Sequence, residues 1–440
     1  MKYTIFLFLL ALNLQSTAQT TRSKQPNIIL IMADDIGFEA FNSYGNTNYK
    51  TPRINQMAAK GMQFNYCYSQ PLCTPSRVQI MTGKYNFRNY LKFGSLDMNE
   101  TTFAHILKSE GYKTCIAGKW QLGSDAFGPY KAGFDSYHLW QLTFTSYNER
   151  YKNPRVLENG VMKKYNNGEY GPKLHTEFIM DFMETNKDEP FFAYYPMALT
   201  HRPYVPSPDT ENYDSFDIPG EGNAHSTKSD PIYFKDEVAY MDKLVGEIID
   251  KTVELGIADN TLIIFTGDNG TGVGIKSQMG NVTIPGMKGS TTEYGMHVPL
   301  VAYWAGQIKA GQQNDNLIDF TDFLPTIAQA ANIKLPESFE TDGLSFYPQL
   351  KGDFSDTRNW IFSHYDPGKE KFPLKRLVQN KEWKLYENGE FYNVKNDPYE
   401  KKDLSKSQLS REVLKLKEEF STVLAKMHVT ELPIDDKTKD

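Results

Sequence analysis

Residues 27–35 read NIILIMADD, a run of apolar side chains that ends in two neighbouring carboxylates. The part Asn27–Met32 has the length of a strand and is apolar at consecutive rather than alternate positions, which is typical of a strand buried on both faces. Three further runs share this form: Lys113–Ala117, Phe191–Tyr195 and Thr261–Phe265. We therefore predict four buried strands, each followed by polar residues.

Helical patterns separate these strands. Thr51–Lys60 and Phe103–Glu110 each stop before a glycine, and Thr176–Asn186 and Phe234–Leu255 are longer. The alternation predicts an α/β fold, a mainly parallel sheet sandwiched by helices. Ligands of such sheets bind beyond the carboxyl ends of the strands. The polar residues after these ends should therefore converge on one edge: Asp34, Asp35, Lys119, His201, Asp268 and Asn269.

The C-terminal part has a different pattern. Short strand-like pieces precede a charged amphipathic helix at about Leu409–His428, and they are Trp360–Ser363, Arg376–Gln379, Trp383–Tyr386 and Phe391–Val394. This order predicts a small α+β subdomain in which the helix packs on an antiparallel sheet. We expect a signal peptide at 1–18, a catalytic domain at 19–350 and a C-terminal subdomain at 351–440, with a soft boundary within 343–358.

Acidic pairs after strands bind hard cations through oxygen. Asp34, Asp35, Asp268 and Asn269 offer three carboxylates and one amide oxygen, a set that suits Ca²⁺ or Mg²⁺. Taken singly, each pair is equally well explained as turn and cap residues. Their occurrence together after matching strands favours a metal site.

The run Cys73-Thr74-Pro75-Ser76-Arg77 is expected to open a helix that ends before Gly83. Free N–H groups and the positive end of the helix dipole would then favour an anion beside Cys73. The alternative is a buried cysteine before an ordinary helix. The other two cysteines, Cys67 and Cys115, lie in apolar stretches and are expected in the core, with a disulfide between them left open.

Several motifs occur in one order along the chain and together resemble the type I sulfatases. They are Asp34-Asp35-x-Gly37, Cys73-x-Pro75-Ser76-Arg77, Gly118-Lys119-Trp120, His201-x-Pro203, Gly267-Asp268-Asn269-Gly270, and Lys288 with Glu293. The stretch from Arg376 to Glu400 resembles the C-terminal subdomain of that family, so the resemblance spans about residues 26–404. It implies an alkaline-phosphatase-like fold and the hydrolysis of sulfate esters.

The resemblance also implies a mechanism. A maturation enzyme, of the formylglycine-generating or the radical type, would oxidise Cys73 to formylglycine. One hydroxyl of its hydrate attacks the sulfur, the alcohol leaves, and the second hydroxyl then loses its proton so that sulfate is expelled and the aldehyde returns. A serine in this place would remain sulfated.

Roles follow from the same resemblance. Residue 73 would join Asp34, Asp35, Asp268 and Asn269 around Ca²⁺, with Mg²⁺ as the alternative. Arg77 would steady the formylglycine hydroxyls, and Lys119 and Lys288 would hold sulfate oxygens. His201 would bind sulfate or protonate the leaving oxygen.

The chain departs from the family pattern at two positions. The family usually has histidine where this chain has Gln121, which can hydrogen-bond but cannot take a proton at neutral pH. Turnover would then be slower, or another base would serve. His297 stands where the family more often has arginine, a position that is expected to be structural.

The N-terminal residues and the composition indicate the location of the protein and the classes of partner it lacks. Lys2, the apolar stretch Tyr3–Leu14 and the small residues Ser16-Thr17-Ala18 are typical of a secretory signal, so we expect a periplasmic or secreted protein. The apolar stretch is too short to span a membrane, and no longer one follows. The net charge of −6 gives no indication of nucleic-acid binding, which basic surfaces usually mediate.

A sulfated polysaccharide or oligosaccharide is the expected substrate of such an exported enzyme. Aromatic and arginine side chains suit sugar rings and anionic neighbours. The candidate substrate contacts are Gln121, His138, Trp140, Arg202, His297, His364 and Asp366. Two alternatives remain: a phosphodiesterase or phosphonate monoester hydrolase on the same scaffold, and a glycan-binding protein that has lost turnover.

Overall fold

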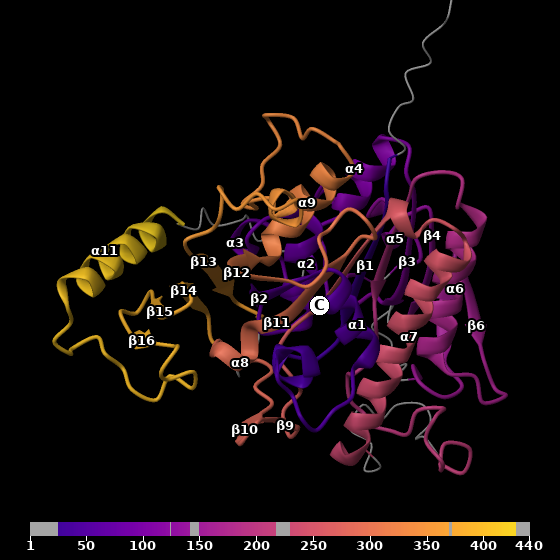
Figure 1. The fold of residues 1–440 in the computed structure, drawn as a ribbon, viewed down its shortest axis with the longest axis horizontal. Coiled ribbons are helices and arrows are strands. Elements are labelled where there is room, and N and C mark those ends of the chain that lie inside the picture. Colours follow the sequence, from indigo (N-terminus) through magenta and orange to yellow (C-terminus); the bar gives the residue numbers. More distant parts are fainter. Residues whose placement is uncertain (1–24, 124, 141–148, 217–228, 369–371, 428–440) are drawn as a thin grey trace, which may run out of the picture.

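The computed structural model describes residues 25–123, 125–140, 149–216, 229–368 and 372–427. Its centre is a ten-stranded sheet (Figure 1). In spatial order its strands are β12 (Gln312–Asp319), β2 (Met62–Tyr68), β11 (His297–Tyr303), β8 (Thr261–Gly267), β1 (Asn27–Ala33), β7 (Phe191–Pro196), β3 (Lys113–Lys119), β4 (Ser136–Trp140), β5 (Arg155–Glu158) and β6 (Val161–Lys164).

The strands at the middle of this sheet run parallel, which confirms the predicted fold class. β1 pairs in parallel with both β7 and β8, β7 pairs with β3, and β3 pairs with β4. β11 lies antiparallel between β8 and β2, and β5 lies antiparallel between β4 and β6. The four strands expected from the sequence are therefore neighbours, in the order β8-β1-β7-β3.

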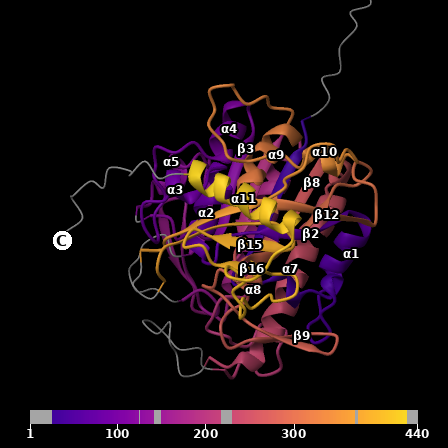
Figure 2. The same cartoon turned by 90° about the vertical axis from the view of Figure 1, so that its left-hand side faces the viewer.

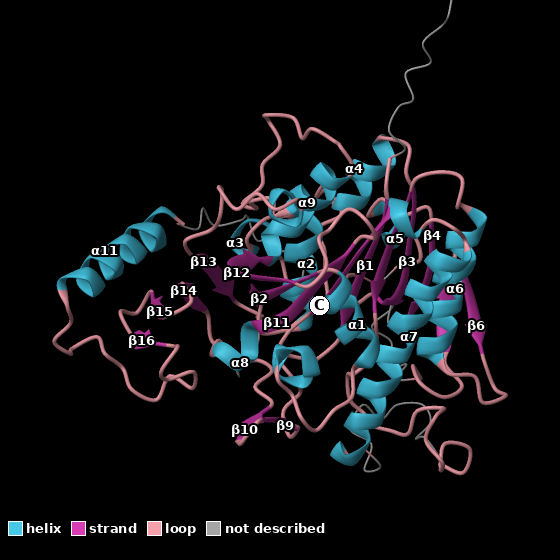
Figure 3. Cartoon of the chain, viewed as in Figure 1, coloured by secondary structure: helices cyan, strands magenta, loops and turns pink. Residues whose placement is uncertain are grey.

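Helices cover both faces of the sheet (Figure 3). Ile29 and Ile31 of β1 share a buried apolar cluster with residues of α1 (Pro52–Lys60), α6 (Gly171–Thr185) and α7 (Phe234–Glu254). Ile28 and Leu30 point the other way, into a cluster with α2 (Cys73–Thr82), α4 (Phe103–Ser109) and α9 (Phe323–Ala330). Because successive side chains of a strand alternate between faces, a strand apolar at every position fits this double cover.

A second sheet follows in the C-terminal part, as predicted. β13 (Ile361–Tyr365), β14 (Lys375–Gln379), β15 (Trp383–Tyr386) and β16 (Phe391–Asn393) form antiparallel neighbours in chain order. α11 (Arg411–Lys426) packs Phe420 and Leu424 against this sheet, and Figure 2 shows it lying across the sheet. The domain boundary at residue 350 stays a prediction.

The remaining elements are short. They are the hairpin β9 (Lys276–Met279) and β10 (Val282–Pro285), the helices α3 (Asn86–Asn89), α5 (Gly128–Lys131), α8 (Glu293–Met296) and α10 (Tyr347–Leu350), and the 3₁₀ turns η1 (Phe38–Ala40), η2 (Asn42–Tyr44), η3 (Pro231–Tyr233), η4 (Ala258–Asn260) and η5 (Phe320–Asp322).

Some expectations need correction or lie outside the described residues. α6 begins at Gly171 rather than Thr176, because Pro172 suits a first helical turn. The three cysteines are free and buried, so Cys67 and Cys115 form no disulfide. The expected signal peptide at 1–18 and the end of the last helix at His428 lie outside the described residues. Within the described ranges, no helix has the length and apolar character needed to cross a membrane.

Candidate active site

Three neighbouring strand ends bring the first site residues together. Beyond β1, the Asp34 amide donates to the Leu199 carbonyl at 2.7 Å and its carbonyl accepts from the Thr200 amide at 2.7 Å. On the other side, the Asp268 amide donates to the Ala33 carbonyl at 2.9 Å. The sheet therefore continues for a residue or two past its strands, and it places the loop before His201 and the residues after β8 on either side of Asp34.

Asp35 turns back over this edge. Its φ of 60° lies in the left-handed region. Its amide donates to Asp268 Oδ1 at 3.0 Å, and Asn269 Nδ2 donates to Asp35 Oδ1 at 3.0 Å. The Lys288 ammonium lies 2.6 Å from the Asp35 carboxylate. Burial alone would raise the pKa of Asp35, but the charges of Lys288, His201 and Lys119 together outweigh it and hold that pKa below its usual value.

Asp34 makes a second ion pair, wholly inside the protein. Lys119 Nζ lies 2.7 Å from Asp34 Oδ2, and both side chains are 0% exposed. Arg77 donates to Asp268 Oδ2 and to the Lys119 carbonyl, each at 3.0 Å. Burial raises the pKa of Asp34 although Lys119 opposes this. A cation at this edge would favour the charged form of the carboxylate.

Cys73 is the first residue of α2, as predicted, and it is 2% exposed. Its Sγ donates to Gln121 Oε1 at 2.8 Å. Gln121 reaches this point because it follows the end of β3 with a φ of 54°. One residue before Lys119, β3 passes close to the end of β7: a Cβ on Gly118 would lie 2.0 Å from the Pro196 carbonyl oxygen, so this close approach requires glycine.

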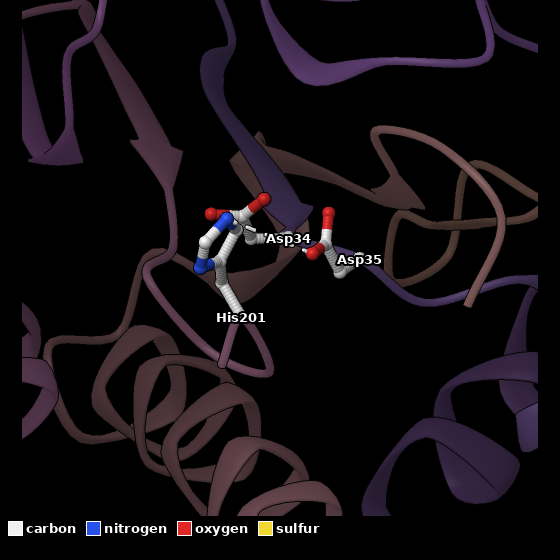
Figure 4. A group of neighbouring side chains, drawn as sticks. All are labelled: Asp34, Asp35 and His201. Carbon is white, nitrogen blue, oxygen red and sulfur yellow. Dashed lines mark ion pairs between the residues drawn. The ribbon is translucent and has the colours of Figure 1, made fainter. Parts of the chain in front are cut away.

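His201 completes the cluster from the loop after β7. Figure 4 shows its ring beside Asp34 and Asp35 where β1 ends, and its Nε2 lies 3.7 Å from Asp35 Oδ2. Nδ1 faces away, 3.1 Å from Arg150 Nη2 and 2.7 Å from the Arg202 carbonyl. Burial lowers the pKa of His201 to about 3, although the carboxylate of Asp35 opposes this.

The residues present fit a hard divalent cation. Asp34 Oδ1 and Asn269 Oδ1 are buried and have no hydrogen-bond partner among the described residues. Asp34, Asp35 and His201 each offer a ligand atom within 4.8 Å of the other two. Ca²⁺ and Mg²⁺ prefer oxygen ligands, so the oxygens of Asp34, Asp35, Asp268 and Asn269 would suit such an ion better than the His201 ring would.

The structure does not bring all of the expected sugar contacts to this cluster. His138 is 2% exposed, and its Nδ1 lies 2.7 Å from Nδ1 of His175. His297 is 4% exposed, bonds Glu293 at 2.7 Å and stacks on Phe38. These contacts belong to neither Asp34, Asp35 nor Cys73, so His138 and His297 stay predictions as substrate contacts.

The other expected contacts have mixed positions. Trp140 is also buried and carries the guanidinium of Arg150 on its ring, 4.5 Å from the centroid. Arg202 is exposed beside His201. His364 is half-buried on β13, and Asp366 is exposed and accepts from the Gly368 amide at 3.1 Å. Substrate contact therefore stays a prediction for these four residues, Trp140, Arg202, His364 and Asp366.

Sequence reasoning missed Arg150, which contacts His201 directly. The residue lies in none of the motifs and follows no predicted strand. Its neighbours Trp140 and Tyr151 are aromatic, and an arginine among aromatic residues is the one local signal that could have pointed to it.

Comparison with known proteins identifies the family. Residues 26–333 match the family model Sulfatase, and residues 288–426 match the model described as N-sulphoglucosamine sulphohydrolase, C-terminal. The chain therefore belongs to the sulfatase family and is a sulfuric ester hydrolase. The resemblance drawn from its motifs is confirmed.

Individual relatives agree with this. N-acetylgalactosamine-6-sulfatase of Mus musculus is 29% identical over 375 residues, which cover 75% of this chain and 67% of that protein. The crystal structure of Ps i-CgsB in complex with k-i-k-neocarrahexaose has a TM-score of 0.73, 26% identity and 92% coverage of each chain. A protein in complex with its substrate, D-glucosamine-2-N,6-O-disulfate, shares the fold at 21% identity and a TM-score of 0.73, covering 92% of this chain and 97% of the other.

Proposed function

We propose that this protein removes sulfate from a sulfated carbohydrate, using formylglycine at position 73 and a calcium ion. The observation that carries the proposal is the convergence of Cys73, Arg77, Lys119, Lys288 and His201 on one cluster with the carboxylates of Asp34 and Asp35. In such a site an anionic ester meets three cationic side chains and the start of a buried helix.

Each residue of the cluster has a distinct task in this proposal. The hydrated aldehyde would supply one hydroxyl to attack sulfur and a second to expel sulfate, and the cation would favour the ionised form of the attacking hydroxyl. Gln121 Oε1 accepts a hydrogen bond from position 73 and so orients that residue. Lys119 and Lys288 neutralise charge on the sulfate oxygens, while Arg77 holds Asp268 and the strand end of β3 in place.

A cavity beside the cluster suits the sugar. It has a volume of about 460 Å³, within the range of about 300–1,000 Å³ usual for small-molecule sites, and Lys288 contributes to its wall. Tyr365, Phe372 and Lys375 line it, so rings and a cation are available to a sulfated saccharide. A larger cavity of about 570 Å³ is lined by Tyr66 and His297 and by none of the cluster residues. We therefore choose the smaller cavity as the sugar site because Lys288 lines it, and not because of its volume.

Support for a carbohydrate substrate also comes from the relatives, whose names include N-acetylgalactosamine-6-sulfatase and whose structures hold a neocarrahexaose or a glucosamine disulfate. We further propose that the chain is exported, to the periplasm or beyond, and that a maturation enzyme oxidises Cys73. A panel of oligosaccharides, each sulfated at one defined position, would identify the sugar and the hydroxyl.

Cys73→Ala tests the central claim. The variant should fold and lose turnover entirely, because alanine cannot be oxidised to the aldehyde. Cys115→Ala, which removes a buried cysteine outside the cluster, is the matched control and should keep activity. Intact-mass measurement of the peptide around residue 73 should show the aldehyde in the active protein, and full activity of Cys73→Ala would refute the mechanism.

Asp268→Asn tests the metal site. Loss of one carboxylate should weaken calcium binding by at least about tenfold, measured by titration calorimetry. Asp209→Asn removes a carboxylate from an exposed ion pair with Lys243 and should leave the affinity unchanged. Equal affinities in the wild type and in Asp268→Asn would remove Asp268 from the ligand set.

Comparing nitrophenyl sulfate with nitrophenyl phosphate separates the sulfatase from the phosphoester alternative. The proposal expects the sulfate ester to be hydrolysed with the higher kcat/KM. A preference for the phosphate ester would favour the alternative.

A further inference from the structure

The larger cavity, of about 570 Å³, lies where the edge of the main sheet meets the C-terminal part of the chain. Its wall includes Gln63 and Tyr66 of β2, Gln313 of the edge strand β12, and Lys381 and Lys395 from turns of the C-terminal sheet. We call it the edge cavity. It shares no wall residue with the smaller cavity of the candidate active site, so the two are separate places on the protein.

One wall of the edge cavity is a polar patch on two neighbouring strands. Gln63 and Asn65 lie two residues apart on β2, so their side chains share one face of the sheet. Gln63 Nε2 lies 3.3 Å from Gln313 Oε1 on β12, and Asn65 donates to Asp315 at 2.7 Å. The central strands are apolar throughout, whereas this part of the sheet presents amides, which can both donate and accept hydrogen bonds.

Several polar atoms in the wall lack a partner. Gln63 Oε1, His297 Nε2 and Ser43 Oγ are buried and make no hydrogen bond to any described residue. The side chains of Gln63 and His297 are only 2% and 4% exposed. Buried polar groups are nearly always paired, because an unpaired one costs free energy. Three such atoms around one cavity indicate a place that is completed by a polar ligand.

Aromatic rings form another part of the wall. The rings of Phe38 and Tyr66 lie nearly parallel to that of His297, with centroids 3.9 Å and 5.9 Å away. Tyr294 stacks in turn on Phe38, with an interplanar angle of 14°. Aromatic side chains next to polar groups suit a ligand that has both apolar faces and hydroxyl groups, as a sugar ring does.

The charges of the edge cavity favour an anion. Lys381 and Lys395 are exposed, and neither forms an ion pair with another described residue. The ammonium of Lys381 lies 5.5 Å from the ring centroid of Tyr66, so the charge and the ring are presented together. The carboxylates of Asp315 and Glu293 already accept hydrogen bonds from neighbouring side chains. The two ammonium groups are therefore the charges that remain for a ligand.

We propose that the edge cavity is a second carbohydrate site, which binds a sulfated saccharide without hydrolysing it. Lys381 and Lys395 meet its sulfate groups, the aromatic wall packs on a sugar ring, and the amides bond its hydroxyls. The cavity contains neither position 73 nor the acidic residues of the candidate metal site, so it cannot cleave the ester. A single sugar unit bound beside Lys288 leaves the edge cavity free. The choice of sulfate as the anionic group rests on the proposed function.

Acetylation of lysines, followed by mass spectrometry, can locate the ligand without any change to the edge cavity. Cys73→Ala protein would be labelled with and without hexasaccharides of chondroitin sulfate, heparan sulfate and carrageenan, each also in desulfated form. At least one sulfated hexasaccharide should slow the labelling of Lys381 and Lys395 severalfold. Lys415, an exposed lysine on α11, is the internal reference and should be labelled at the same rate throughout.

Three results would overturn the proposal. One is protection of Lys288 and Lys375 alone, which would place the saccharide only in the smaller cavity. Another is equal protection of Lys381 and Lys395 by a desulfated hexasaccharide, because the ligand would then be a neutral sugar. The third is unchanged labelling of Lys381 and Lys395 with every hexasaccharide.

A double variant tests the wall residues, with protection of Lys381 as the signal. Gln313→Ala/Lys395→Met removes one amide and one ammonium, both exposed, so the fold should be kept. The concentration of sulfated hexasaccharide that halves the labelling of Lys381 should rise about tenfold or more, since a charged contact is lost. Gln329→Ala/Lys415→Met removes the same groups elsewhere on the surface and should leave this concentration as it is. The same value in both double variants would contradict the proposal.

The second site and the proposed function can fail separately. Protection of Lys381 and Lys395 in a protein whose mature form hydrolyses no sulfate ester would refute the proposed function and leave the second site standing. Hydrolysis of a sulfate ester by a protein in which no hexasaccharide protects these lysines would refute only the second site.

Discussion

Two ammonium–carboxylate pairs lie side by side in the candidate active site and are held in different ways. The Lys119–Asp34 pair joins the ends of two sheet strands and is fully buried. The Lys288–Asp35 pair joins a loop to the residue beyond a strand end, and Lys288 is 18% exposed. The sheet register sets the first pair, whereas the second depends on how the loop around Lys288 is supported.

That support comes from the C-terminal sheet. Lys384 of β15 donates to the Thr291 carbonyl at 2.6 Å, and Tyr386 bonds the Thr291 hydroxyl at 2.8 Å. Glu400 bonds both of these side chains. The Lys119–Asp34 pair is thus held within the main sheet, whereas the loop that carries Lys288 is held by contacts with the C-terminal sheet.

The largest effects are expected for Lys119→Ala and Lys288→Ala, which should lower kcat alike but differ in the loss of unfolding free energy. Both should lower kcat by two to three orders of magnitude, on the order of the loss of an oxyanion donor. After chelation of metals, Lys119→Ala should also lower the free energy of unfolding by about 3 kcal/mol, because it leaves Asp34 buried without its closest cation. Lys288→Ala should cost less than this, because Lys288 is 18% exposed and water can replace part of its interaction with Asp35, which is itself only 3% exposed. If urea unfolding gave equal losses of unfolding free energy for the two variants, the two ion pairs would contribute equally to stability and the prediction would be wrong.

A smaller effect on turnover is expected from Lys384→Met, which removes the support of the loop. Burial of Lys384 is complete, and its loss leaves Glu400 without its cation, so the free energy of unfolding should fall by about 3 kcal/mol. KM for a sulfated sugar should rise more than kcat falls, since Lys119 and Asp34 are untouched. Lys415→Met, at an exposed lysine of α11, is the control and should change neither.

The smallest effect on turnover is expected at Glu39. This residue is buried beside the site and accepts a hydrogen bond from the Thr271 hydroxyl at 2.5 Å. Burial raises the pKa of Glu39 to about 7 from 4.5. The folded protein then binds a proton that the unfolded chain has released, so stability should fall as the pH rises from about 4.5 to about 7, by up to about 3 kcal/mol.

Glu39→Gln should remove this dependence without changing kcat. The measurement is urea unfolding of both proteins at pH 5 and at pH 7.5. If the wild type gains stability relative to the variant over this interval, the buried carboxyl is not the cause of the slope.

The clustering of the candidate site residues could largely be predicted from the sequence, because these residues follow strand ends. β1, β3, β7 and β8 are continuous apolar runs, and a parallel sheet brings the residues after them to one edge. The C-terminal strands could be predicted as well, since short alternating pieces with polar turns indicate an antiparallel sheet.

Other parts depend on contacts that local patterns do not encode. β2, β11 and β12 carry register shifts, between Val298 and Leu300 and between Asn314 and Leu317, which interrupt the periodicity of a strand. His138 follows a plausible loop motif, yet it lies on β4 with its ring turned into the core against His175. Arg150 contacts His201, which is distant in sequence, and only the folded chain shows that pairing.

All ten residues of α2 are buried, from Cys73 to Thr82. An oxidising enzyme has to hold the segment around Cys73 in its own active site, and it cannot do so once this helix is enclosed. The proposed chemical change must therefore be made on a chain that is still unfolded, so catalytic competence would be decided during biosynthesis. Protein that folded first would remain permanently inactive, with a native structure and an unconverted thiol.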